Sequence, residues 1–220
     1  MAVLSFDATG ERFYETGAKN AVLYPLESSG TYGTGVAWNG LTGVTHSPEG
    51  AEPTDLWADD MKYATMRSAE NFNCTIEAYN YPVEFNKCNG VGTLTDGAYV
   101  GQQSREAFGL SYITQVGNDV SQEVAQKLHL LYGLTASPSE LAYATINDSP
   151  EAVTMSWECT STPVAVTGFD ATSEITLDSR DLSTEAWNAL IEKLHGGSST
   201  EATLPLPDEI KTIIATADAA

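Results

Sequence analysis

The chain has 220 residues, of which 30 are acidic and 10 are basic, so its formal net charge at pH 7 is −20. A surface of this sign repels the phosphates of nucleic acids and anionic membranes, which excludes sequence-specific DNA or RNA binding through a basic face. Hydrophobic residues make up 42% of the chain and there are four tryptophans, which predicts a folded domain rather than a disordered segment.

The N-terminus and the cysteines indicate in which cellular compartment the chain is expected. The first residues, MAVLSFDATGERFYETG, lack the basic start and long apolar run of a signal peptide, and no stretch reaches the roughly 18 apolar residues of a membrane span. We expect a soluble, unprocessed chain. The three cysteines, Cys74, Cys88 and Cys159, are widely spaced and match no metal-binding pattern, so we expect buried thiols in a reducing compartment.

Apolar and polar residues alternate in many runs along the chain, with turn residues between the runs. The clearest run begins at Phe72, where Phe72, Cys74, Ile76 and Ala78 share one face. Such runs predict strands at 21–24, 40–47, 72–78, 108–113, 128–133, 153–160, 164–167 and 174–177. This number of strands predicts a mainly β fold of two packed antiparallel sheets, as a sandwich or a partly closed barrel, with one flanking α-helix.

Residues 43–60 are expected to form a long acidic loop. The segment carries five carboxylates, no Lys or Arg, two prolines, and the large apolar residues Leu56 and Trp57. Structureless loops longer than about 15 residues are uncommon in compact domains and are usually functional or disordered. A Trp in such a loop favours docking against a partner over exposure to water.

The flanking helix is predicted at 183–195. Its apolar residues follow the i, i+3, i+4, i+7 spacing of one helix face: Trp187, Leu190, Ile191 and Leu194. Ser183 or Thr184 can cap its start, and two glycines follow His195. We expect one β domain over 1–195, and a linker and C-terminal arm over 196–220 that docks elsewhere, with a short amphipathic helix after an extended stretch at 204–207.

A search for chemistry finds no pattern typical of an enzyme, so we expect no catalytic site, no cofactor and no metal. The histidines His46, His129 and His195 lack metal-ligand spacing, and no nucleotide-binding glycine motif or GxSxG string occurs. A glycosidase is the most tempting enzymatic alternative, with Glu77 and Glu158 as natural carboxylate candidates. Both lie on polar strand faces, where a solvated or subunit-facing side chain is the simpler interpretation.

Several unusual strings follow one another along the chain: PEGAEPTDLWAD, EAYNYPVEF, FGLSYITQVGND and NDSPEAVTMSWECTSTPV. In these strings and their order the chain resembles the major tail protein, or tail tube protein, of long-tailed, siphovirus-type phages and related prophages. The resemblance covers about residues 10–210 and is weakest at the two ends. It implies a structural subunit, six copies of which close a ring, and rings that stack into a hollow conduit for DNA passing from capsid to host cell.

The same resemblance implies partners and places. The partners are further copies of the chain, a tape-measure protein in the lumen, and tail-terminator and distal-tail proteins at the tube ends. DNA passes without specific binding, no membrane is involved, and the protein is assembled in the host cytoplasm and located in the virion tail.

The resemblance and the acidic loop together suggest site residues. Glu77 and Glu158 are candidates for acidic side chains facing the lumen. The candidate ring or subunit interface consists of Trp38, Asn39, Pro48, Glu49, Glu52, Pro53, Asp55, Leu56, Trp57, Asp59 and Asp60. A carbohydrate- or surface-binding β-domain, as in an adhesin or another tail component, is the alternative, and an acidic hydrolase is a third.

Overall fold

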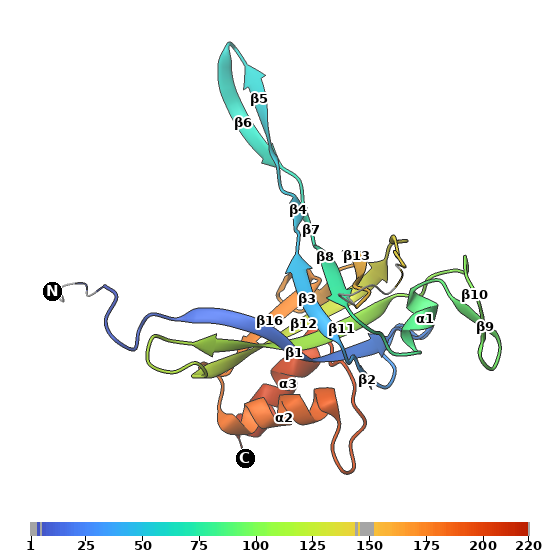
Figure 1. The fold of residues 1–220 in the computed structure, drawn as a ribbon. Helices are drawn as coiled ribbons and strands as arrows, with labels where there is room; N and C mark the ends of the chain where they lie inside the picture. The colour runs from blue at the N-terminus through green and yellow to red at the C-terminus, as the bar shows by residue number, and fades with distance from the viewer. Residues whose placement is uncertain (1–3, 5, 144, 146–151, 220) are drawn as a thin grey trace.

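The computed structural model describes residues 4, 6–143, 145 and 152–219. Its centre is one antiparallel sheet of eight strands in the order β2-β1-β11-β12-β13-β8-β3, with β16 paired to β12 (Figure 1). The strands of this sheet are β1 (Tyr14–Pro25), β2 (Val36–Ala37), β3 (Leu41–His46), β8 (Asn73–Ala78), β11 (Phe108–Gly117), β12 (Ala125–Ala136), β13 (Met155–Ser161) and β16 (Glu174–Asp178). The mainly β fold class is confirmed, and each predicted strand corresponds to an observed one.

Four two-stranded ribbons extend from this sheet. They pair β4 (Glu49–Gly50) with β7 (Glu70–Asn71), β5 (Pro53–Ala58) with β6 (Met61–Arg67), β9 (Gly92–Thr95) with β10 (Ala98–Val100), and β14 (Val164–Val166) with β15 (Phe169–Thr172). The last part of the NDSPEAVTMSWECTSTPV string forms β13, whereas its residues 147–151 lie outside the described residues.

The sheet folds into two layers because β12 has two different partners along its length. Its first part, Lys127–Leu131, pairs with β16, and its last part, Leu134–Ala136, pairs with β13. Gly133 lies between them at a φ of 59°. The two predicted sheets are therefore layers of one hydrogen-bonded sheet, and the barrel that they outline is not closed.

The first hydrophobic core fills the space between the two layers. Alternate residues of the facing strands enter it, among them Leu110 of β11, Ile76 of β8 and Trp157 of β13, each 2% exposed or less. Trp38, Tyr81, Phe85, Phe108 and Trp157 surround one another in edge or tilted aromatic contacts. This is the half-buried face that the alternation predicts for strands with one polar side.

The second core lies between the other face of β1, β11 and β12 and the helices α2 (Thr184–His195) and α3 (Pro207–Asp218). The predicted helix 183–195 is confirmed, with Ser183 accepting a hydrogen bond from the Ala186 amide as its N-cap. Tyr24 crosses this core and donates its hydroxyl to the carbonyl of Leu194 at 2.8 Å. Both faces of the central strands are thus buried.

The C-terminal segment corrects the predicted domain organisation. Residues 196–219 do not leave the domain, because α3 packs against α2 and both Leu204, before α3, and Ile210, within it, are buried in the second core. Lys193 of α2 and Glu209 of α3 form an ion pair at 2.8 Å. The short helix was predicted, but its apolar residues cover the chain's own sheet. A further short helix, α1 (Phe85–Cys88), was not predicted and also flanks the core, so the predicted flanking helix is one of three helices in the described part of the chain.

Candidate functional site

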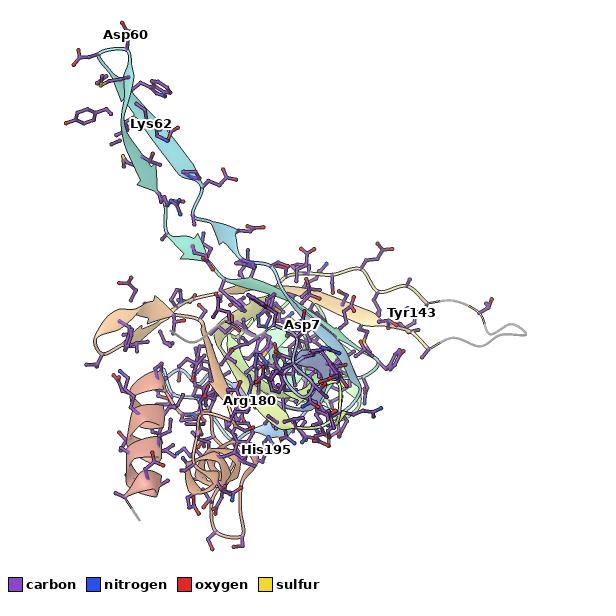
Figure 2. All side chains as sticks on the ribbon, turned by 90° about the vertical axis from the view of Figure 1, so that its left-hand side faces the viewer. Asp7, Asp60, Lys62, Tyr143, Arg180 and His195 are labelled. Carbon is purple, nitrogen blue, oxygen red and sulfur yellow. The ribbon has the colours of Figure 1, made fainter. Side chains whose placement is uncertain are left out.

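One extended β-hairpin dominates the surface. The pair β3–β8 continues through β4–β7 into β5–β6, and residues 47–71, which we call the projecting hairpin, extend far from the body (Figures 1 and 2). Between Gly43 and Leu56 the register is constant, with Gly43 paired to Glu77, Glu49 to Asn71 and Leu56 to Ala64. It shifts only before Gly43 and between Leu56 and Trp57 near the tip. The strands of the body and of the hairpin therefore form one ribbon.

The predicted acidic loop at 43–60 is replaced by this hairpin. Residues 41–46, 49–50 and 53–58 are strands, and the partner strand Met61–Arg67 was not predicted. The turn that joins them consists of Asp59 and Asp60, with φ values of 52° and 61°. Two positive φ values define a type I′ turn, for which Asn-Gly is the usual sequence signal. Because Asp-Asp is a weaker signal, the sequence pattern hid the hairpin.

The two faces of the projecting hairpin differ in chemistry. Since side chains alternate along paired strands, Leu56 shares a face with Ala64 and Met66, and Asp55 shares the other with Thr65. On the polar face Lys62 reaches Asp55 at 2.7 Å and Thr65 donates to Asp55 at 2.9 Å. Along the constant register, the apolar face continues the side of β3 and β8 that is buried in the body.

This apolar face is exposed in the single chain. Leu56 is 40% exposed, Met61 65% and Met66 60%. Elsewhere on the hairpin, Trp57, which is paired with Lys62, is 69% exposed, and Tyr63 is 76% exposed. An isolated two-stranded hairpin is marginally stable in water at best. Of the predicted interface residues, Pro48, Glu49, Glu52, Pro53, Asp55, Leu56, Trp57, Asp59 and Asp60 all lie exposed on the projecting hairpin.

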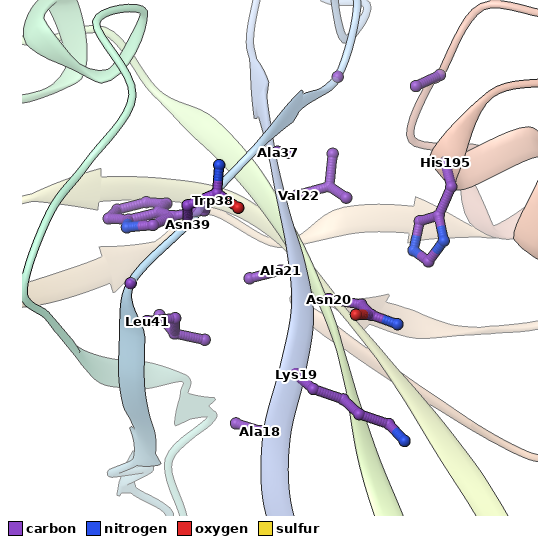
Figure 3. Close-up of a pocket in the computed structure, with 13 residues that line it drawn as sticks. Ala18, Lys19, Asn20, Ala21, Val22, Ala37, Trp38, Asn39, Leu41 and His195 are labelled. Carbon is purple, nitrogen blue, oxygen red and sulfur yellow. The ribbon is translucent and has the colours of Figure 1, made fainter.

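Trp38 and Asn39 do not belong with that set. Trp38 is 3% exposed, and its indole N–H donates to the carbonyl of Asn80 at 2.9 Å inside the first core, so its assignment to a subunit interface is wrong. Asn39 is exposed in the turn before β3, on the rim of a groove between β1 and β3. Figure 3 shows this groove, of about 540 Å³, with His195 of α2 on its far side.

Glu77 and Glu158 lie on one face, as predicted for polar strand positions. In the β8–β13 pair, Glu158 is opposite Thr75 and Glu77 is opposite Ser156, so both carboxylates point away from the first core. The same outward face of β3, β8 and β13 carries hydroxyl and amide side chains: Thr45, Asn73, Thr75, Ser156 and Thr160. This three-stranded face has no Lys or Arg and no large apolar residue, so it is a polar surface whose charged groups are all acidic.

A histidine cluster that sequence spacing did not reveal lies at the root of the projecting hairpin. His46, the last residue of β3, contacts Tyr112 at 2.6 Å through Nε2 and Glu174 at 3.2 Å through Nδ1. His129 stacks on Tyr112 and lies 4.0 Å from Glu174. The neighbouring imidazoles of His129 and His46, of which His46 is at 3.2 Å, lower the pKa of the Glu174 carboxyl to about 2. The cluster ties the hairpin root to β11, β12 and β16.

The described residues contain no group of three or more His, Cys, Asp or Glu side chains arranged to hold a metal ion. Within the same ranges, no helix is both long and apolar enough to cross a membrane. The thiols Cys74, Cys88 and Cys159 are free and buried, and Cys74 is paired opposite Cys159 across β8 and β13.

Comparison with known proteins identifies no family for this chain. No protein-family model matches the chain, and no curated protein matches it. Among solved structures, a chain in "Cryo-EM structure of the anti-feeding prophage (AFP) baseplate, 6-fold symmetrised" is similar over 79% of this chain and 97% of its own length, with 11% identity and a TM-score of 0.36. A similarity of this extent supports no conclusion about function, which rests on the sequence and the geometry above.

Proposed function

We propose that this protein is a structural subunit of a phage tail tube, which self-assembles into stacked hexameric rings that form a conduit for DNA. The observation that carries the proposal is the projecting hairpin. Its apolar face continues the buried side of β3 and β8, yet nothing in the described chain covers it. In an assembly, a neighbouring copy would bury Leu56 and Met66, as an exposed apolar surface requires. Self-assembly of this kind agrees with the sequence resemblance to tail tube proteins.

Other projecting elements support assembly over a lone domain. Large apolar side chains are exposed on the remaining ribbons, with Leu94 72% exposed, Tyr99 51% and Phe169 75%, and Phe6 near the N-terminus is 79% exposed. The outer edges of β2 and β3 end the main sheet without a further strand in the described chain. Ring formation would pair such edges with those of neighbouring subunits, a common way of protecting them from aggregation.

The outward face of β3, β8 and β13 suits the wall of the conduit in this proposal. Glu77 and Glu158 supply negative charge, and the face offers DNA phosphates no Lys or Arg to bind. Six copies of a −20 chain give each ring a formal charge of about −120. DNA would therefore slide through without specific binding, and the protein needs no catalytic site, metal or cofactor.

The remaining partners in the proposal come from the resemblance to tail tube proteins. A tape-measure protein occupies the lumen before DNA does, and tail-terminator and distal-tail proteins close the two ends. Assembly takes place in the host cytoplasm, and the finished protein is located in the virion tail.

Negative-stain electron microscopy of the purified protein, at high concentration in low and in moderate salt, tests the proposal. Hollow tubes or six-fold rings are the expected result. A protein that stays monomeric under all conditions, and also when mixed with preformed tail tips, contradicts it. Binding of that monomer to a glycan array, through exposed aromatic residues such as Trp57 and Tyr63, would instead support a carbohydrate- or surface-binding β-domain.

A further inference from the structure

Basic side chains are scarce in this protein, and most are already paired. Seven of the ten Lys and Arg residues form ion pairs with carboxylates of the same chain: Arg12, Lys19, Lys62, Lys127, Arg180, Lys193 and Lys211. Among the described residues, the three without such a partner are Arg67, Lys87 and Arg105. Arg67 belongs to the projecting hairpin. Lys87 lies in α1, and Arg105 is hydrogen-bonded to Asn89, the residue that follows α1. In a −20 chain, two unpaired cations in one place are unusual.

Arg105 is held in place by neutral groups only. Its Nη1 donates to the carbonyl of Ala136 at 3.0 Å and to Asn89 Oδ1 at 3.3 Å. Its side chain crosses Gly90, where a Cβ atom would lie 3.3 Å from the Arg105 Cγ and Nε atoms. The Nε and Nη2 donors have no partner in the described chain. These donors form the planar fork that binds a carboxylate through two parallel hydrogen bonds.

A cavity opens beside this guanidinium. It has a volume of about 220 Å³, and Tyr81, Trp157 and Arg105 line it. Glu140 lies on its rim but forms no ion pair with Arg105. Lys87, two residues before Asn89 of the cavity lining, is exposed, and its carbonyl accepts a hydrogen bond from the backbone amide of Glu106 at 3.2 Å. The cavity thus combines a preorganised fork with room for a short acidic side chain, and the adjoining helix α1 carries a second cation.

The matching anions lie at the tip of the projecting hairpin. Asp59 and Asp60 are exposed and adjacent, and neither has an ion-pair partner in the described chain, because Lys62 is bound to Asp55. In Figure 1 the tip of the hairpin points away from the body against which α1 lies, so a contact between the tip and α1 joins two copies. We propose that Arg105 and Lys87 form a carboxylate site that receives the Asp59–Asp60 turn of a second copy; this inference rests on the proposed self-assembly.

Zero-length crosslinking tests the contact directly. Assembled protein made from equal parts of nitrogen-15-labelled and unlabelled chains is treated with a carbodiimide, which joins a carboxylate to a lysine amine in contact with it. We expect mixed-isotope peptides linking Lys87 to Asp59 or Asp60. In Arg105→Lys, which keeps the charge and adds a reactive amine, we expect a second such link at position 105. Asp59→Asn with Asp60→Asn removes both links.

Charge reversal gives an independent measurement. Arg105→Glu should raise the protein concentration needed for assembly at least tenfold, and Asp60→Arg in the same chain should restore most of that loss by reversing both partners. Glu140→Gln is the matched control on the rim and should leave assembly within twofold of the wild type. The melting temperature of each variant monomer shows whether it is folded.

Three outcomes overturn the proposal. Links between copies can form elsewhere while Lys87 and position 105 never join Asp59 or Asp60; Arg105→Glu can assemble like the wild type; or the amine at position 105 can link only to Glu140 of its own chain. In each case rings still form, so the proposed function stands and only the docking site is wrong. If wild-type chains never associate, the proposed function and this inference fail together.

Discussion

Gly133 shows how one residue permits the two-layered sheet. Its φ of 59° is one that L side chains rarely adopt, and a Cβ there would lie 2.3 Å from the carbonyl oxygen of Thr162. We expect Gly133→Ala to lower the free energy of unfolding by about 3 kcal/mol, measured by urea denaturation. Gly168→Ala is the matched control: its φ is 85°, but no atom lies within 4 Å of the added Cβ, so we expect a loss of about 1 kcal/mol. Equal losses would show that the Thr162 contact is unimportant.

Glu174 links stability to pH. Its pKa in the folded protein is about 2, against an ordinary value of 4.5, because the imidazoles of His129 and His46 lie close to it. A lowered pKa stabilises the fold above about pH 4.5, and this contribution is lost as the pH falls toward 2. We therefore expect Glu174→Gln to destabilise the protein by about 2 kcal/mol at pH 7 and by much less at pH 2.5.

Urea denaturation of both proteins across this pH range measures the effect of Glu174. Glu158→Gln, at an exposed carboxylate on the outward face, is the control and should change stability little at either pH. A Glu174→Gln difference that does not shrink in acid would assign the loss to packing rather than to the charge.

At the level of the element, substitutions in the projecting hairpin should affect assembly with little effect on the stability of the monomer. Because the body of the monomer does not cover the apolar face of the hairpin, we expect Leu56→Thr with Met66→Thr to change the melting temperature little. The same variant should raise the critical concentration for assembly at least tenfold, since burial of each side chain contributes about 1.5 kcal/mol or more. Sedimentation velocity and light scattering measure both states.

Two further variants serve as the control and as the complete removal of the hairpin. Thr65→Ser, on the polar face, keeps the hydrogen bond to Asp55 and should assemble normally. Replacing residues 50–70 by Asn-Gly joins the directly paired Glu49 and Asn71 through a type I′ turn, and should give a folded, non-assembling monomer. Normal tubes from that shortened chain would show that the hairpin has no part in assembly.

At the level of the whole molecule, the net charge of −20 opposes association. Salt shortens the screening length from about 30 Å at 0.01 M to about 10 Å at 0.1 M, which weakens repulsion between copies. We expect assembly to be promoted by sodium chloride over this range, followed by light scattering at fixed protein concentration. Assembly that is independent of salt over a tenfold range would show that the charges are matched locally at the interfaces.

The sequence predicted those parts of the molecule in which local pattern and tertiary structure agree. The alternation at Phe72–Ala78 corresponds to a strand with one buried face, and the capped apolar stripe at 183–195 is a helix. Both faces of β11 and β12 are buried, and the apolar residues Ile113 and Leu131 on the second face of each run indicated this.

The missed features depend on distant contacts or on weak local signals. From its local sequence Trp38 is interpreted as an exposed docking residue. The residues that bury it, Phe85 and Trp157, are distant in the sequence, so the local pattern does not reveal them. His46 on β3 and His129 on β12 are brought together only by the two-layered fold of the sheet, in which β8 and β13 connect these two strands. The strand at 61–67 exposes both of its faces, so it lacks the half-buried alternation by which strands are recognised.

The constant register of the long ribbon limits how related hairpins can differ in length. Inserting one residue into each strand near the body keeps the backbone pairing, but it turns Leu56 and Met66 to the polar side and Asp55 to the apolar side. Inserting two residues into each strand restores the original sides and moves the tip outward. Lengths that preserve docking therefore change in steps of two residues per strand. We expect the hairpins of homologues to differ in length by multiples of two residues in each strand.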